Sequence, residues 1–304
     1  MTYLVFPVES KDNIPLAVAV IIFTVFVLSL GDAIIKQSSG NFVIWQIFVI
    51  RSLIVIPCVV LYLSIKERGR LCLPDALGWT ILRSVLLVSM WISYYISLPN
   101  LTLSVAAAAY YTLPIFITLL SAVIIGDEIN RTGWFAVFLG FVGVLLILRP
   151  SAGDFNWFAL LPLLSAIFYA LAMILTRTKC RAEHPIVLSL ALNVSFVFIG
   201  GAATLFLTML PDEMRQGFLL APWAKMGFSQ WISMSLLAVA ILVGSVGAAI
   251  AYQNAPSSVI GIFDFSYVGF AVAWGVIFFA DVPDVISVLG IGLIIGAGIM
   301  SLRQ

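Results

Sequence analysis

The chain has 304 residues, of which 62% are hydrophobic and only 10% are charged, and its formal net charge is +1. A soluble domain carries about 25% charged residues, so a water-soluble fold of this composition would leave much of its outer face apolar, whereas a lipid bilayer solvates such a face. The near-zero net charge argues against nucleic acid as a partner. The three cysteines indicate neither a disulfide framework nor a metal site, and no cofactor is expected.

Ten apolar segments follow one another along the chain, most of them close to the roughly 20 residues that cross a bilayer as a helix. They span residues 14–35, 42–64, 77–98, 103–125, 134–148, 157–176, 185–210, 231–253, 259–280 and 285–302. Short polar turns separate most of them, and the longest connection, 211–230, is amphipathic. The pattern predicts an all-α integral membrane protein with ten transmembrane helices, preceded by a cytoplasmic segment, residues 1–13.

Lysine and arginine are distributed unevenly between the two sets of loops. With the N-terminus inside, nine of these residues fall in cytoplasmic segments and four on the opposite side. Because cytoplasmic loops are enriched in positive charge, this bias places both termini in the cytoplasm. We therefore expect a multi-pass protein of the inner (plasma) membrane.

An internal repeat emerges when the chain is shifted against itself. An offset of 154 residues pairs Ser104 with Ser258, Val105 with Val259, Asp127 with Asp281, and Arg149 with Arg303. Each half, 14–149 and 157–303, then holds five helices, and an odd number inverts the second half in the membrane. Inverted five-helix repeats are a transporter architecture with the substrate site between the halves.

The residues of the first half resemble a known family. Residues 95–114 read YISLPNLTLSVAAAAYYTLP, and 119–128 and 140–150 follow with LLSAVIIGDE and GFVGVLLILRP. These stretches are similar to the EamA family of the drug/metabolite transporter superfamily, and 278–283 and 290–292 are similar to the end of its second repeat. The sequence departs from the family pattern at Asp127, an extra acid before Glu128, and at Val268, which stands where the repeat would place a partner for Pro114. The resemblance implies a transporter of small metabolites, with amino acids and related compounds as common cargo.

Charged residues within the apolar segments are the first candidates for function, because each costs about 2.5–3.5 kcal/mol at the middle of a helix. Asp32 and Lys36 lie four residues apart, so a local ion pair is the favoured interpretation and a role at the outer mouth the alternative. Arg83 and Asp264 lie at similar depths and could pair across the two halves, either as a gate or as a static contact. Arg51 is interpreted as structural, snorkelling or bonded to backbone carbonyls.

Polar and aromatic side chains inside the helices predict the wall of a substrate cavity. The candidates are Trp91, Tyr94, Tyr95, Tyr111, Tyr169, Gln253, Tyr267 and Trp274. Trp79, Trp134, Trp157 and Trp231 lie near helix ends and are typical of the interfacial belt. Pro114 removes a backbone donor and predicts a helix kink. Gly140 and Gly143, and Gly292 and Gly296, predict close packing of the last helices of the two halves.

These features together predict a secondary transporter that moves amino-acid-like or other amphipathic metabolites by alternating access, in either direction. Asp32, Arg83 and Asp264 are the candidates for gating or coupling, and Asp32 and Asp264 are the carboxylates that could carry a proton. No G-x-x-x-x-G-K-[ST] phosphate loop is present, which excludes ATP hydrolysis within this chain. A membrane-embedded enzyme and a channel are the alternatives, although no catalytic motif or filter loop supports them. The expected partners are a small-molecule substrate and the lipid bilayer, and the chain could act as a monomer or a homodimer.

Overall fold

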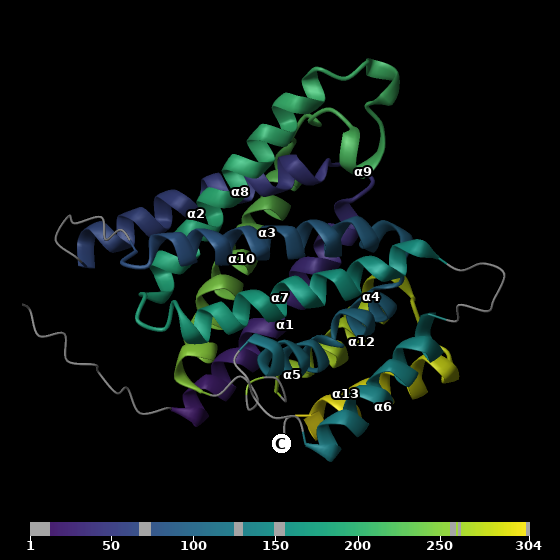
Figure 1. Cartoon of the computed structure of the whole chain (residues 1–304). Helices are drawn as coiled ribbons and strands as arrows, with labels where there is room; N and C mark the ends of the chain where they lie inside the picture. Colours follow the sequence, from purple (N-terminus) through teal and green to yellow (C-terminus); the bar gives the residue numbers. More distant parts are fainter. Residues whose placement is uncertain are drawn as a thin grey trace, which may run out of the picture.

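The computed structural model describes residues 13–66, 74–124, 130–148, 156–255, 260 and 263–301. All regular secondary structure in these ranges is helical, as Figure 1 shows, which confirms the predicted all-α class. The predicted cytoplasmic segment lies almost wholly outside the described residues. So do the repeat partners Asp127, Arg149, Ser258, Val259 and Arg303, and Glu128.

Within the described ranges, six helices are long and apolar enough to cross a membrane. They are α1 (Ile14–Ser38), α2 (Ile44–Lys66), α3 (Leu77–Ser97), α7 (Leu160–Thr178), α8 (Pro185–Thr208) and α10 (Phe228–Asn254). Two begin at side-chain caps: Asn13 accepts from the backbone N–H of Leu16, and His184 accepts from that of Ile186. Such caps satisfy backbone donors that the first turn of a helix leaves without partners. A multi-pass membrane protein follows from these six helices.

The remaining apolar helices are shorter, and one predicted helix is broken. They are α4 (Leu103–Tyr110), α5 (Leu113–Ile124), α6 (Arg131–Leu148), α12 (Ser266–Phe279) and α13 (Val285–Ser301). A continuous helix over 103–125 was the wrong expectation, because the chain turns at Tyr111 and Thr112 before α5 starts. Pro114 is the second residue of α5, where its missing N–H costs nothing, and a proline disfavours helical backbone in the residue before it. A second turn, at Phe265, immediately precedes α12.

The helices pack in antiparallel pairs around a central group. Figure 1 shows α2 along α8 at one edge of the molecule and α6 along α13 at the opposite edge, with α1, α4 and α12 between them. Helix α1 packs against α10 and α12, and α3 packs against α7. Large apolar side chains point outward, as Phe23, Phe138 and Phe198 do with exposures of 59, 65 and 73%. Such an outer surface suits lipid.

The contact between α6 and α13 depends on glycines of α6. A Cβ atom on Gly143 would lie 2.8 Å from the carbonyl oxygen of Gly290, and one on Gly140 would overlap the side chain of Ile115. The predicted role of the G-x-x-x-G pair in α13 is wrong, because a Cβ on Gly292 or Gly296 would meet nothing within 4 Å. In α13 it is Gly290 that lies against Gly143 of α6, so the close approach is made there and not at Gly292 or Gly296.

The segment after α8 folds back over the N-terminal end of α2. It contains η3 (Asp212–Met214) and α9 (Gly217–Leu220). The indole of Trp45 donates to the carbonyl of Leu219, and the Gln46 amide both donates to and accepts from the backbone of Ala224, each at 2.8 Å. This segment is therefore fixed to the helix ends that it covers.

Candidate functional site

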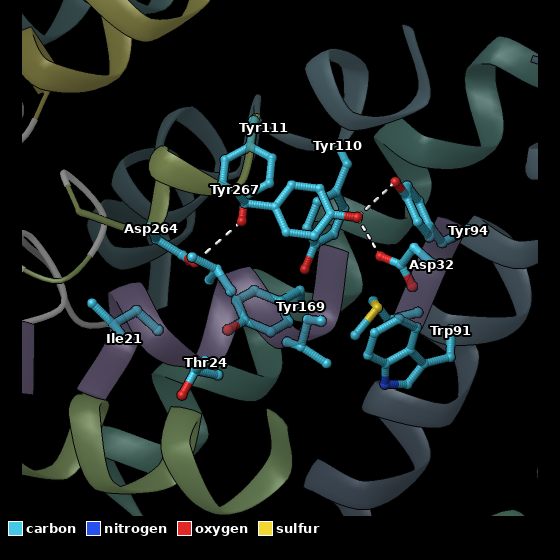
Figure 2. Close-up of a pocket in the computed structure, with 13 residues that line it drawn as sticks. Ile21, Thr24, Asp32, Trp91, Tyr94, Tyr110, Tyr111, Tyr169, Asp264 and Tyr267 are labelled. Atoms are coloured by element: carbon cyan, nitrogen blue, oxygen red, sulfur yellow. Dashed lines mark hydrogen bonds between the residues drawn. The ribbon is translucent and has the colours of Figure 1, made fainter. Parts of the chain in front are cut away.

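A small cavity lies among α1, α3, α4, α7 and the start of α12. Figure 2 shows its lining, which is rich in tyrosine: Ile21, Thr24, Val25, Leu28, Asp32, Met90, Trp91, Tyr94, Tyr110, Tyr111, Tyr169, Asp264 and Tyr267. The α1 residues recur every three or four positions, so one face of that helix forms one wall. The cavity volume is about 30 Å³, room for one or two water molecules. Pockets for organic ligands measure roughly 300–1,000 Å³, so the cavity in this structure is too small to hold a metabolite.

Asp32 is held at one side of the cavity by a tyrosine of α12, which is itself bonded to a tyrosine of α3. Its side chain is only 2% exposed. The hydroxyl of Tyr267, on α12, donates to one carboxylate oxygen of Asp32 and lies 3.0 Å from the hydroxyl of Tyr94, on α3 (Figure 2). A chain of hydrogen bonds thus connects α3, α12 and α1 across the cavity wall.

Asp264 occupies an equivalent environment on the other side. It is also 2% exposed, and its two carboxylate oxygens accept from the hydroxyls of Tyr111 and Tyr252, each at 3.2 Å. The rings of Tyr111 and Tyr267 stack with centroids 5.0 Å apart. The two carboxyl groups are therefore linked by one continuous group of tyrosine side chains.

Neither carboxyl group has a cationic partner within ion-pair distance in the described part of the chain. An ionised carboxylate in a low-dielectric interior is costly unless it is paired and hydrogen-bonded. Tyrosine hydroxyls supply hydrogen bonds but no positive charge. A proton or a cationic group of a ligand can supply the missing charge.

The predicted Asp32–Lys36 pair is wrong, although the spacing would allow it. The Lys36 ammonium instead forms an ion pair with Asp281, 3.2 Å away, and donates to the carbonyl of Leu101 at 2.6 Å. It also lies over the ring of Phe279, 4.9 Å from the centroid. The Lys36 side chain is 15% exposed at this position, whereas Asp32 is only 2% exposed. The contact with Asp281 therefore lets the ammonium keep some hydration, which a contact with Asp32 would remove.

The predicted Arg83–Asp264 pair is not formed either. Arg83 is 1% exposed, and its Nε donates to the hydroxyl of Thr176 on α7 at 2.6 Å. Asp264 meets tyrosines instead. Arg83 does not line the cavity. Its position in the α3–α7 contact favours the static of the two roles considered for it.

Contacts between segments far apart in the sequence connect the helix ends at both ends of the bundle. At the end that carries Lys36, the Lys36–Asp281–Leu101 contacts join the end of α1, the turn before α4 and the turn after α12. We call these three residues the Lys36 latch. At the opposite end, the amide of Gln253 donates to the carbonyls of Cys180 and Glu183, and the Glu183 carboxylate accepts from the backbone N–H of Ala76. We call these four residues the Gln253 latch.

The structure brings together seven of the residues predicted for the site and places four elsewhere. Trp91, Tyr94, Tyr111, Tyr169, Tyr267, Asp32 and Asp264 line the cavity. Tyr95 packs behind Trp91, Trp274 donates to Ser29 beside Phe26, Gln253 belongs to the latch named after it, and Arg83 lies in the α3–α7 contact. Pro114 lies in the first turn of α5, next to the helix break.

Two polar residues of the cavity lining, Thr24 and Tyr110, were not identified from the sequence. Tyr110 forms a tandem with Tyr111 at the break between α4 and α5, and a tyrosine pair followed by a proline was the available signal. Tyr252, the neighbour of Gln253 on α10, bonds to Asp264, whereas Gln253 does not line the cavity. In the described residues, no group of three or more His, Cys, Asp or Glu side chains could hold a metal ion.

The fold and this site are those of an α-helical membrane transporter, and comparison with known proteins gives the particular kind. Residues 15–149 match the model of the EamA-like transporter family, which confirms the resemblance seen in the sequence. This chain is a small-metabolite transporter related to that family.

Curated relatives and a solved structure agree with this assignment. The chain is 23% identical to the pseudopaline exporter CntI of Pseudomonas aeruginosa, over 94% of this chain and 95% of that one. It is 25% identical to a riboflavin transporter of Rhizobium johnstonii, over 79 and 75%, and 28% identical to an S-adenosylmethionine uptake transporter of Rickettsia bellii, over 57 and 58%. A protein of known crystal structure shares the fold, with a TM-score of 0.63, 13% identity and coverage of 94 and 97%.

Proposed function

We propose that this protein is a secondary transporter that moves an amphipathic or zwitterionic metabolite by alternating access. The observation that carries the proposal is the tyrosine-lined cavity with two buried carboxyl groups, with the Lys36 latch at one end of the helix bundle and the Gln253 latch at the other. A cavity that lies between two such latches and is too small for a metabolite corresponds to an occluded state. Opening one latch at a time would expose the cavity to one side of the membrane.

The proposed architecture has ten transmembrane helices in two inverted five-helix repeats, 14–149 and 157–303. The protein lies in the inner membrane, and both termini lie in the cytoplasm. Two observations support the inverted repeat. The turn at Phe265 follows the turn at Tyr111 by 154 residues, the same offset that aligns the halves in sequence. The cavity also takes Asp32 from the first half and Asp264 from the second.

This topology is tested by labelling single cysteines from outside. Asn100→Cys and Asn254→Cys are placed in a background without native cysteines, in intact cells and in permeabilised cells. We expect a membrane-impermeant maleimide to label position 100 in intact cells and position 254 only after permeabilisation. Labelling of both from the same side would eliminate the inverted repeat.

The proposed coupling ion is a proton carried by Asp264 or Asp32. Both carboxyl groups are buried and bonded only to tyrosine hydroxyls among the described residues, so protonation would remove the uncompensated charge before the site moves. The rings of Tyr111 and Tyr267 stack, but no hydrogen bond among the described residues joins the two carboxyl groups, so each would carry its proton separately. The proposal covers transport in either direction, because the relatives include an exporter and an uptake transporter by name.

Counterflow in proteoliposomes is the decisive experiment. Vesicles that contain the purified protein are loaded with an unlabelled metabolite and diluted into the same labelled compound, over a panel of amino acids, nucleosides and vitamins. We expect transient accumulation of at least one compound, which an enzyme cannot produce and a channel does not sustain. Tyr111→Phe and Trp91→Ala should weaken the apparent affinity, and unchanged affinity in both variants would show that the cavity is not the substrate site.

A further inference from the structure

Arg51, on α2, is a cation enclosed by four aromatic rings. Its side chain is only 1% exposed. The guanidinium carbon lies 4.5 Å from the ring centroid of Phe196, 4.9 Å from that of Phe48, 5.7 Å from that of Tyr95 and 6.0 Å from that of Trp91. Contacts of this kind contribute about 0.5–2 kcal/mol each. They hold the cation in place without using its N–H donors, because the face of an aromatic ring attracts a positive charge but is a weak hydrogen-bond acceptor.

The hydrogen bonding of Arg51 is incomplete on one edge. Its Nη1 donates to the Tyr95 hydroxyl at 3.3 Å, whereas Nε and Nη2 have no hydrogen-bond partner in the described residues. These two nitrogens form the edge of a guanidinium that binds a carboxylate through two parallel hydrogen bonds. A buried cation without a counter-ion is costly. Among the described residues no carboxylate lies within ion-pair distance of Arg51, so this edge is left with two unused donors that an anion could accept from.

This edge of Arg51 and the cavity share a wall. Trp91 lines the cavity (Figure 2) and also lies against the guanidinium, and Tyr95 stacks behind it with ring centroids 4.9 Å apart. Asp32, on the opposite side of the cavity wall, lies within electrostatic range of Arg51. A change in the orientation of the Trp91 ring would join the two spaces. The opening that enlarges the cavity would then expose the free edge of Arg51 to the solute.

The charges around the cavity define the kind of solute. Arg51 can bind one carboxylate, and the two carboxyl groups of the cavity can bind a cation. A solute with one anionic and one cationic group would satisfy both, whereas a polyanion would be repelled by Asp32 and Asp264. We propose that Arg51 is the residue that binds the carboxylate of the transported solute. This rests on the proposed transport function, but the binding step is tested without transport.

The test measures the thermal unfolding of the purified protein in detergent by its tryptophan fluorescence. The probes are acetate and a series of amino acids, each compared with the amide of the same compound, in which the carboxylate alone is replaced. We expect the carboxylates to raise Tm more than the amides do. The half-saturating concentration should rise about tenfold in Arg51→Lys, which keeps the charge but loses the two-donor edge. The rise in Tm should vanish in Arg51→Met.

Arg83→Met is the matched control, because Arg83 is equally buried and does not border the cavity. It should keep the response to carboxylates. If Arg51→Met does not purify as a monodisperse protein, Arg51→Lys decides the question by itself. The proposal is overturned if no carboxylate exceeds its amide in the wild-type protein, or if the response persists undiminished in the Arg51 variants. Carboxylate binding that depends on Arg51, without counterflow of any compound, would instead refute the transport proposal.

Discussion

Breaking the Lys36 latch should open the cavity from the end of the molecule that carries Lys36. In Asp281→Asn the ion pair at 3.2 Å is lost, while the bond from Lys36 to Leu101 can remain. The two side chains are 15 and 22% exposed, so the pair is neither fully solvated nor buried. Its contribution should fall between exposed pairs, about 0.2–1 kcal/mol, and hydrogen bonds to charged groups, about 1.5–3 kcal/mol.

A loss of about 1–2 kcal/mol shifts a two-state equilibrium by about 5- to 30-fold. If the latch forms only in the occluded state, Asp281→Asn should raise the open population by that factor. Lys36→Met should raise it further, because this change also removes the bond to Leu101. The size of this change in the open population requires that the Lys36 latch be absent from the open state, and the assay tests this requirement.

The assay measures how fast a charged methanethiosulfonate reagent modifies a cysteine in the cavity. Thr24→Cys is a suitable reporter, because Thr24 lines the cavity and its hydroxyl has no hydrogen-bond partner in the described residues. Native cysteines are replaced, and the reagent is added from the side of Lys36. We expect the modification rate to rise about 5- to 30-fold in Asp281→Asn.

The matched control is Asp212→Asn, which breaks the Arg215–Asp212 ion pair, 3.0 Å long. That pair lies within one short turn and joins no distant segments, so the rate should not change. An Asp281→Asn rate equal to that of the wild-type protein, or an equal increase in both variants, would refute the latch.

Four further predictions follow from other contacts. Tyr267→Phe removes the donor to Asp32 and should reduce counterflow about tenfold, because a buried group left without a partner costs about 1–3 kcal/mol. The control is Tyr110→Phe, which should stay within about twofold of the wild-type rate, because the Tyr110 hydroxyl has no hydrogen bond among the described residues. Asp264→Asn should abolish solute-driven proton movement, measured with a pH dye inside the vesicles, while the exposed Asp212→Asn should not; proton movement that persists in Asp264→Asn rules this residue out as the carrier. Gly143→Val should lower the free energy of unfolding by about 1–3 kcal/mol through the clash with Gly290, which is measured as a lower Tm. Gly292→Val should have little effect, because a Cβ there meets nothing within 4 Å. Equal decreases of Tm in the two variants would contradict the close contact at Gly143. Burial raises the pKa of the Cys180 thiol, so little reactive thiolate forms. Maleimide labelling of Cys180 should accelerate about tenfold in Gln253→Ala, which loses two hydrogen bonds of roughly 1 kcal/mol each, but not in Gln230→Ala. Equal labelling rates in the wild-type protein and in Gln253→Ala would show that the Gln253 latch does not control access to Cys180.

Prediction from the sequence succeeded where local composition is enough. Six of the long apolar segments form helices that are long and apolar enough to cross a membrane, and a helix satisfies the backbone hydrogen bonds of such a segment in lipid. The stripe of Trp91 and Tyr94 on α3 was recognised from helical spacing, and both residues face the cavity. The break at Tyr111 was missed as a break, although Pro114 marked its position.

The spacing of residues along the sequence could not predict the ion-pair and hydrogen-bond partners of the charged side chains. The interval of four residues between Asp32 and Lys36 favoured a local pair, yet Lys36 bonds to Asp281, 245 residues away in the chain, and Asp32 bonds to Tyr267, 235 residues away. Arg51 was predicted to snorkel, but α8 brings Phe196 against it and closes an aromatic cage. Such contacts depend on which helices become neighbours.

The sequence by itself determined that this protein is a helical membrane transporter, because hydrophobicity, loop charge and the family motifs are local properties of the chain. The tertiary structure alone decided where the two acids, the tyrosines and the buried arginine meet. Helical periodicity states which residues share a face, but the packing of helices far apart in sequence determines what that face contacts. The cavity, its two latches and the unfilled edge of Arg51 are all products of that packing.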